Sequence, residues 1–297
     1  MKFRDILRLR YHARGEPHAA SSPPHPVDRS SAPPPGWIPA SLIVSFFAVL
    51  TIVNSFPLAI RPDAIIGQHG DAMFSVWRLA WIAHQLRTDP RHLFDGNIFY
   101  PERATLAYSD AMLLPGTILA PLNWAGIDPL VVYNVALMLA FFLSALAAYF
   151  LVRRLTGSVS AGLLAGIIFA FSAHRFEHFD HLELQFAFWI PLAMLVWHHA
   201  VTGDAARGYL KVAAIAGCQV LSCIYYGLFL VTWLAVMTVV WFARTPFRAA
   251  RAGALILLSV SSCAMISARA PVPAPTTATP RPDIGAPDAP IRSLPPT

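Results

Sequence analysis

Residues 130–152 read LVVYNVALMLAFFLSALAAYFLV, a run that contains no Asp, Glu, Lys or Arg. A helix needs about 20 predominantly apolar residues to cross the hydrocarbon core of a bilayer, which is about 30 Å thick. Backbone amide and carbonyl groups in lipid must be paired within the segment, so a helix is the expected form. The run therefore predicts a membrane-spanning helix over residues 129–152.

The rest of the chain has the same apolar character. It is 56% hydrophobic and 13% charged, whereas a soluble domain carries about 25% charged residues. Its mean hydropathy is +0.53. We therefore expect an all-α, polytopic integral membrane protein with about seven spans. The spans are predicted at residues 37–57, 129–152, 159–173, 186–201, 209–224, 227–243 and 253–267.

The two ends of the chain differ from its middle in composition. Residues 1–36 are basic and then rich in proline and serine, and residues 268–297 are rich in proline, alanine and threonine. Neither composition can bury an apolar core, so both segments are predicted to be disordered. The spans thus form one membrane domain over residues 37–267, and the abrupt tail is typical of a truncated or frame-shifted end.

The chain is basic, with a net charge of +6 and a pI of about 9.5. Its basic residues stand mostly between apolar runs, which indicates anionic lipid rather than nucleic acid as the partner. If residues 112–124 form an interfacial helix that does not cross, these later residues share one side: Arg153, Arg154, Arg207, Lys211, Arg244, Arg248 and Arg251. The positive-inside rule makes that side the cytoplasm. We therefore expect a multi-pass protein of the bacterial inner (plasma) membrane with a cytoplasmic N-terminus.

This topology puts two polar segments, residues 58–128 and 174–185, on the same outer face. The first segment contains a predicted helix over residues 71–86, whose start is Asp71. The apolar positions of this helix recur at helical spacing: Phe74, Trp77, Trp81 and His84. A carboxylate is favoured at a helix start by the helix dipole, so helix capping is one interpretation of Asp71.

The second outer segment is dense in ionisable residues. His174, His178 and His181 are spaced i, i+4, i+7, so they share one face of a helix and could bind zinc. Asp180 and Glu183 could instead bind a divalent cation, Mg²⁺ or Mn²⁺, through oxygen ligands. A solvated loop is the remaining interpretation, because polar groups at the ends of spans stay in water at little cost.

Two features inside the predicted spans concern packing. Gly162 and Gly166 form a G-x-x-x-G motif, which allows two helices to approach closely. The three cysteines all lie in apolar runs and show neither metal-ligand spacing nor a disulfide framework: Cys218, Cys223 and Cys263. We therefore expect these thiols to be small buried apolar groups.

Short segments in a fixed order resemble a known family. They are Gly70-Asp71-Ala72-Met73, residues 100–108 (YPERATLAY), Arg153-Arg154-Leu155-Thr156-Gly157 and residues 171–180 (FSAHRFEHFD). This order resembles the GT-C superfamily of membrane glycosyltransferases, which includes the protein mannosyltransferases and the aminoarabinose transferases of lipid A. The resemblance covers residues 37–267. Members of that superfamily continue with further spans, so the resemblance implies an incomplete or C-terminally truncated member.

The resemblance implies transfer of a sugar from a polyprenyl-phosphate carrier to a glycan, lipid or protein acceptor at the outer face. It makes Asp71 the base that takes the proton of the acceptor hydroxyl. Glu102 and Asp180 become assisting carboxylates for the acceptor or for a cation. The remaining residues that it implies in substrate binding are Arg103 and Arg175, for the carrier phosphate, and Tyr100, His174 and His178.

Two other functions stay open at this point. A transporter or flippase for lipid-linked sugars would place ionisable groups inside broken spans, near the middle of the membrane. A non-catalytic remnant of an enzyme would retain the spans without activity. The chain has no Walker loop, no G-x-G-x-x-G motif and no nucleophile elbow, which argues against a cytoplasmic nucleotide-using enzyme.

Overall fold

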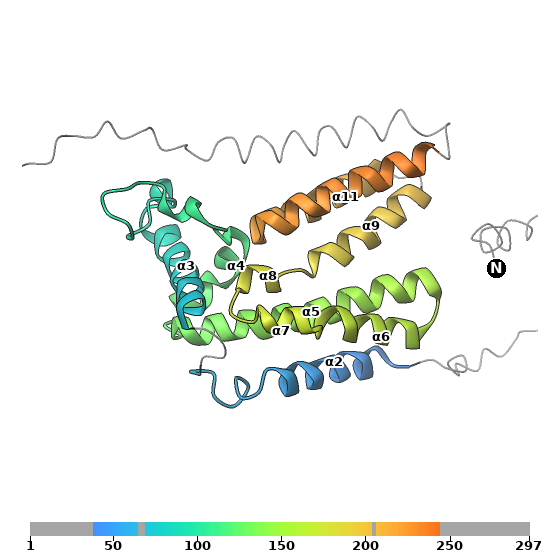
Figure 1. Ribbon diagram of the computed structural model, residues 1–297, viewed down its shortest axis with the longest axis horizontal. Helices are drawn as coiled ribbons and strands as arrows, with labels where there is room; N and C mark the ends of the chain where they lie inside the picture. The colour runs from blue at the N-terminus through green and yellow to red at the C-terminus, as the bar shows by residue number, and fades with distance from the viewer. Residues whose placement is uncertain (1–37, 65–68, 204–205, 244–297) are drawn as a thin grey trace, which may run out of the picture. The chain divides into compact units, whose positions relative to one another are not determined.

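The computed structural model of the chain describes residues 38–64, 69–203 and 206–243. Within these residues every regular element is a helix, which confirms the all-α class for this part of the chain (Figure 1). The longer helices are α2 (Ala40–Asn54), α3 (His69–Thr88), α4 (Leu113–Trp124), α5 (Pro129–Thr156), α6 (Val159–Ala170), α9 (Trp189–Gly203), α10 (Ala206–Ser222) and α11 (Ile224–Ala243). The short ones are η1 (Pro90–His92), η2 (Thr105–Tyr108), α7 (Ala173–Glu177) and α8 (Leu182–Gln185).

Four stretches are long and apolar enough to cross a membrane. They are α5, the stretch Val159–Glu177 that contains α6 and α7, the stretch Leu182–Gly203 that contains α8 and α9, and α11. Each corresponds to one predicted span. α11 begins at Ile224 rather than at residue 227, so the helix is longer than its predicted span. Several apolar helices of this length are compatible with a membrane protein.

Other predicted spans correspond to shorter helices. α2 has 15 residues, and at about 1.5 Å per residue it rises about 22 Å, less than the thickness of a bilayer core. α10 has 17 residues and includes Arg207 and Lys211. The predicted span at residues 253–267, the arm 1–36 and the tail 268–297 lie outside the described residues.

The central helix of the described part is α5. The side chain of Asp128 accepts a hydrogen bond from the backbone N–H of Leu130 at 2.8 Å, and Pro129 occupies the first turn. Both features favour a helix start. The helix ends at Gly157, whose φ of +75° is the left-handed conformation that glycine adopts readily. The buried side of α5 contributes Val132, Tyr133, Ala136, Leu137, Ala140 and Phe141 to the core.

The two motif glycines of α6 lie against α5, as the G-x-x-x-G motif predicted. A Cβ added to Gly162 would lie 2.8 Å from Cδ2 of Tyr149. A Cβ added to Gly166 would lie 2.8 Å from the carbonyl oxygen of Ala145 and would also clash with the ring of Phe47 on α2. Only glycine therefore permits this separation of α2, α5 and α6.

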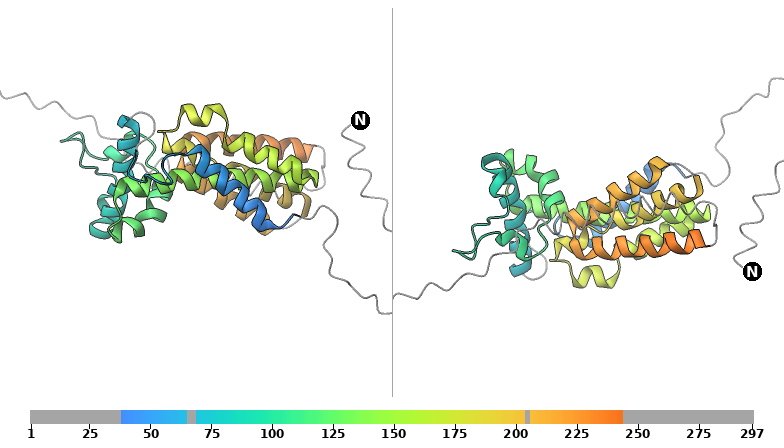
Figure 2. Two further views of the ribbon diagram at one scale, coloured as in Figure 1. Left: turned by 90° about the horizontal axis from the view of Figure 1, so that it is seen from below. Right: turned by 90° about the horizontal axis from the view of Figure 1, so that it is seen from above.

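The two predicted polar segments, residues 58–128 and 174–185, meet near one end of the long helices α5 and α11. Figures 1 and 2 show α3, α4 and the starts of α5 and α11 at this end, and the α5–α6 hairpin loop at the other. At the far end, Nε of Arg154 lies 3.4 Å from Nε2 of His199. The arginines in the last turn of α5 are thus separated from the acidic residues of the first loop by the length of the helices.

The side of α3 that packs inward is not its aromatic side. The aromatic rings stack along a partly exposed side, at centroid distances of 5.5 Å for Phe74–Trp77 and 6.2 Å for Trp77–Trp81. The buried side is formed by Ala72, Ser75, Val76, Arg78, Leu79, Ile82 and Ala83. Large aromatic rings cover the loop after α3, whereas small and aliphatic side chains fit the closer contact with α4 and α5.

Residues 112–124 were predicted to form an interfacial helix, and α4 (Leu113–Trp124) occupies this segment. Its Gly116 lies against the side chain of Ile82. The indole N–H of Trp124 donates to the carbonyl oxygen of Ala83 at 2.8 Å. The helix therefore packs on α3 rather than standing alone.

The loop between α3 and α4 has an unusual backbone. Phe99, Ala104 and Met112 have positive φ angles of 59°, 55° and 52° although none is glycine. The loop is held by side chains at each stage: Asn97 accepts from the indole of Trp77 at 2.8 Å, and Asp95 accepts from the backbone N–H of Ala104 at 2.9 Å. These contacts fix a conformation that the residues would not adopt by themselves.

Candidate functional site

A pocket of about 240 Å³ lies where α3, α7 and the turn before α8 come together. It is lined by Asp71 and by residues 176–181. The pocket thus combines one residue from the first polar segment with several from the second. The sequence predicted that both segments emerge on one face, and here they share a site.

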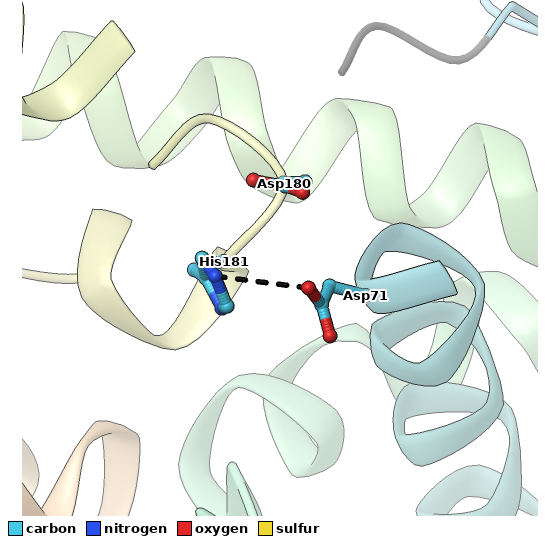
Figure 3. A group of neighbouring side chains, drawn as sticks. All are labelled: Asp71, Asp180 and His181. Atoms are coloured by element: carbon cyan, nitrogen blue, oxygen red, sulfur yellow. Dashed lines mark ion pairs between the residues drawn. The ribbon is translucent and has the colours of Figure 1, made fainter. Parts of the chain in front are cut away.

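Asp71 and Asp180 are the two carboxylates of this pocket. Asp71 stands in the first turn of α3, and its side chain is 52% exposed. Asp180 follows α7, and the residue is only 7% exposed. One carboxylate oxygen of each lies with a ring nitrogen of His181 in a group whose atoms are all within 4.8 Å of one another (Figure 3).

The carboxylate of Asp180 has no hydrogen-bond or ion-pair partner among the residues that the structure describes. Only the backbone of Asp180 is bonded, since its carbonyl oxygen accepts from the hydroxyl of Tyr133 at 3.4 Å. Burying a charged group without a partner is costly. The side chain therefore faces the pocket as an unused acceptor.

His181 lies between two carboxylates. Its Nε2 is 3.7 Å from Oδ2 of Asp71, and its Nδ1 is 3.4 Å from Oε1 of Glu183. The ring is 37% exposed, so it can reach both the pocket and the protein interior. The sequence indicated His181 only as part of a histidine face and did not place it beside Asp71.

Glu183 is anchored on its far side by a buried arginine that the sequence reading missed. Oε2 of Glu183 accepts from Nη2 of Arg78 at 2.7 Å, and Arg78 also donates to Oγ of Ser75 and to the carbonyl oxygen of Asp110, both at 2.7 Å. Glu183 thus faces Arg78 and His181, whereas Asp180 faces Asp71. The expected cation pair of Asp180 with Glu183 is replaced by the group of Asp71, Asp180 and His181.

Asp110 is a second buried residue that the sequence reading missed. It is 4% exposed. Its Oδ1 accepts from the backbone N–H of Ile224 at 2.7 Å, at the start of α11, and its Oδ2 accepts from the thiol of Cys223 at 3.3 Å. Burial raises the pKa of Asp110 above its ordinary value, although both hydrogen bonds favour the ionised form. Asp110 therefore ties the first loop to the start of α11.

Glu102, Arg103 and Tyr100 lie on an exposed loop and do not line the pocket. Tyr100 is 96% exposed. Glu102 accepts from the hydroxyl of Tyr108 at 3.4 Å, on the same loop. The structure therefore does not bring these three predicted site residues to Asp71.

Arg175 is buried, with 6% of its surface exposed. Its guanidinium donates to the side chain and to the backbone carbonyl of Gln185, at 3.1 and 2.7 Å, and to Oγ of Ser144 at 3.0 Å. It also lies 4.7 Å over the ring of Phe141. Its donors are thus used within the protein, and its position gives it a structural role in holding the second polar segment on α5.

The other predicted histidines have different positions. His178 lines the pocket, and its ring lies 4.4 Å from that of His174, which is exposed. Nδ1 of His178 is 2.9 Å from the carbonyl oxygen of His174. Within the described residues these two do not join His181 in a group of metal-ligand atoms.

Neither a family model, nor a curated protein, nor a solved structure matches this chain. The likeness to membrane glycosyltransferases thus rests on the short segments of the sequence and stays a prediction.

Proposed function

We propose that the chain is a membrane glycosyltransferase that moves a sugar from a polyprenyl-phosphate carrier to an acceptor at the outer face of the inner membrane. The observation that carries the proposal is the meeting of Asp71 and Asp180 in one pocket. Within the described residues neither carboxylate makes a hydrogen bond, and the one ion-pair partner of either is His181, 3.7 Å from Asp71. Asp180 is buried all the same, which favours a functional reason for its position.

The pocket suits a displacement at the anomeric carbon of the carrier-bound sugar. The acceptor oxygen forms a bond to that carbon, the bond from the carbon to the carrier phosphate breaks, and the phosphate leaves with the electron pair. Asp71 takes the proton of the acceptor hydroxyl, since its half-exposed carboxylate can meet an acceptor arriving from water. Asp180 orients the acceptor or a cation from the buried side of the pocket.

The position of the pocket suits a substrate anchored in lipid. Its lining includes Asp71 in the first turn of α3 and the residues that connect α7 to α8, so a carrier could keep its chain in the bilayer while its phosphate reaches the pocket. The basic residues Arg153 and Arg154 lie in the last turn of α5, at the opposite end. The positive-inside rule assigns that end to the cytoplasm and the pocket to the outer face, with a cytoplasmic N-terminus.

The test is transfer of labelled sugar from polyprenyl phosphate in membranes of the native host. Asp71→Asn should reduce transfer by about 100-fold or more, because a general base contributes about 10²–10⁴-fold to a rate. Asp180→Asn should also reduce transfer. Glu177→Gln is the matched control, since this exposed carboxylate lines the same pocket outside the Asp71 group.

Equal amounts of each variant in the membrane are required, measured by immunoblot. Full transfer by both Asp71→Asn and Asp180→Asn would exclude this chemistry. Absence of transfer in the unaltered chain, with all sugars and acceptors of the host supplied, would instead favour a non-catalytic protein.

A further inference from the structure

We propose that the pocket binds one divalent transition-metal cation, Zn²⁺ or Mn²⁺, through Asp71, Asp180 and His181. The three side chains each offer one ligand atom, and these atoms lie within 4.8 Å of one another (Figure 3). Bonds of about 2.0–2.2 Å place two ligands of one zinc ion at most about 4.4 Å apart. Rotation of the half-exposed Asp71 side chain closes the group around one ion.

Asp180 gives an independent reason for a cation. Its residue is 7% exposed, its carboxylate faces the pocket, and the described residues offer that carboxylate no donor. Buried carboxylates are normally hydrogen-bonded, paired with a cationic side chain or bound to a metal. The two buried arginines of these segments are engaged elsewhere, since Arg78 pairs with Glu183 and Arg175 with Gln185. A bound cation supplies the missing partner.

The surroundings of His181 match those of a metal-binding histidine. Such a histidine usually presents one nitrogen to the metal and donates the other N–H to a carboxylate, which fixes the ring. Here Nε2 faces Asp71 and Nδ1 lies 3.4 Å from Glu183. Glu183 is itself fixed by Arg78 at 2.7 Å, in an ion pair with side chains only 12% and 3% exposed. The orienting carboxylate is therefore already held in place.

The ligand set selects the kind of cation. Carboxylate oxygens alone would suit Mg²⁺ or Ca²⁺, but an imidazole nitrogen favours a transition metal. Three protein ligands leave at least one position for an oxygen atom from outside the protein. In transfer, which rests on the proposed function, that position would receive an oxygen of the carrier phosphate and offset its developing charge. Metal binding itself requires no such reaction.

The competing arrangement is a simple ion pair. A protonated His181 could attract Asp71 and Glu183 without any metal, and it would leave Asp180 unpaired. The two arrangements differ in what Asp180 does. If the pocket is a metal site, replacing Asp180 weakens metal binding. If His181 is only an ionic partner of Asp71 and Glu183, replacing Asp180 leaves the cation affinity of the chain unchanged.

The experiment uses the full-length chain, purified in detergent, treated with a chelator and titrated with Zn²⁺ alone or Mn²⁺ alone. Bound metal is counted after equilibrium dialysis by mass spectrometry of the metal, and Mn²⁺ also by electron paramagnetic resonance. We expect one ion per chain. His181→Ala, Asp180→Asn and Asp71→Asn should each lower its affinity by about tenfold or more, and Glu183→Gln by about 10–100-fold.

Two control variants lie in the same pocket. His178→Ala removes an imidazole that lines the pocket outside the ligand group. Glu177→Gln removes a carboxylate that also lines the pocket outside that group. Both should leave the affinity within about twofold of the unaltered chain. Size-exclusion profiles identify any variant that has lost its fold, and Asp71→Asn, at an exposed position, keeps the test valid if buried Asp180→Asn unfolds.

The proposal is overturned if the unaltered chain binds neither cation, or if the His181 and His178 variants weaken binding equally. Binding that survives all three ligand substitutions would also overturn it, because the metal would then lie elsewhere. The outcome is separate from that of the proposed function. A chain that binds the ion but transfers no sugar refutes only the transferase, and transfer that persists after the bound metal is removed refutes only the part given to the metal in transfer.

Discussion

Nη2 of Arg78 lies 2.7 Å from Oε2 of Glu183, in an ion pair whose side chains are 3% and 12% exposed. Arg78 belongs to α3 and Glu183 to α8, so this contact joins the two segments that carry Asp71 and His181. The guanidinium also lies 4.7 Å over the ring of Phe74. The ion pair therefore fixes how the two segments of the pocket face each other.

Removing one partner of this pair should destabilise the protein strongly. Arg78→Met leaves the carboxylate of Glu183 buried without its cation, and the loss of one partner of a buried ion pair costs about 3–5 kcal/mol. We expect a clearly lower midpoint of thermal unfolding in detergent. The control is Arg61→Gln, because the Arg61–Asp63 pair is exposed at 66% and 69% and exposed pairs contribute little. Similar midpoints for both variants would show that the buried pair is not structural.

Asp110 should make the stability of the fold depend on pH. Burial raises its pKa above the ordinary value of 3.8, so the folded protein keeps this proton where the unfolded chain has lost it. The stabilisation from the group is therefore complete below the unfolded-state pKa and is lost as pH rises through the folded-state pKa. Asp110→Asn cannot titrate, yet its amide oxygen can still accept from Ile224.

The measurement is thermal unfolding of both proteins at a series of pH values from about 4 upward. The unaltered chain should lose stability relative to Asp110→Asn as pH rises, since the unfolded state then binds fewer protons than the folded state. Parallel curves would contradict a raised pKa, and a relative gain in stability with pH would reverse its direction.

Gly166→Ala should weaken the packing of α6. The added methyl group would clash with the ring of Phe47 and lie 2.8 Å from the carbonyl oxygen of Ala145, and overpacking of this kind costs about 1–3 kcal/mol. Gly217→Ala in α10 is the matched control, because a Cβ there meets no atom within 4 Å. Alanine at that position should instead stabilise the helix slightly. Unfolding midpoints in detergent distinguish the two, and an unchanged midpoint for Gly166→Ala would mean that α2 or α5 can move aside.

Cysteine labelling tests the orientation on which the outer-face chemistry depends. Tyr100→Cys, on the exposed loop after α3, should react with a membrane-impermeant thiol reagent in intact cells. Thr156→Cys, exposed at the end of α5, should react only after the cells are opened. The unaltered chain serves as the background. The reverse pattern would place the pocket in the cytoplasm. Labelling of both cysteines in intact cells would contradict the topology that puts the two positions on opposite sides of the membrane.

The helices could be read from the sequence because long apolar runs and helix boundaries are local signals. Residues 129–152 predicted α5. The helix continues one turn further, to Thr156, and Gly157 then ends it. The inward face of α3 could not be read in the same way. Aromatic residues recur at helical spacing, which indicated a helix but not its buried side, and the inner contact selects smaller side chains and admits Arg78.

The site was predictable in part. Membrane topology alone brought Asp71 and Asp180 to one face, since alternate loops of a helical bundle share a side. The role of Glu183 was not predictable, because its partner Arg78 lies far away in the sequence and only the packing of α3 brings them together. One signal was present: Arg78 lies three residues after Ser75 and four before Ile82, on a single helical stripe.

Phe99, Ala104 and Met112 hold positive φ angles along the loop from α3 to α4. A left-handed conformation costs a non-glycine residue roughly 1–2 kcal/mol, so the stability of the neighbouring helices must offset this local cost. The side chains of Asn97 and Asp95, which bond to Trp77 and to the backbone of Ala104, hold the loop in this conformation. The residue Tyr100, which is 96% exposed, is therefore presented to solvent from a backbone of defined conformation.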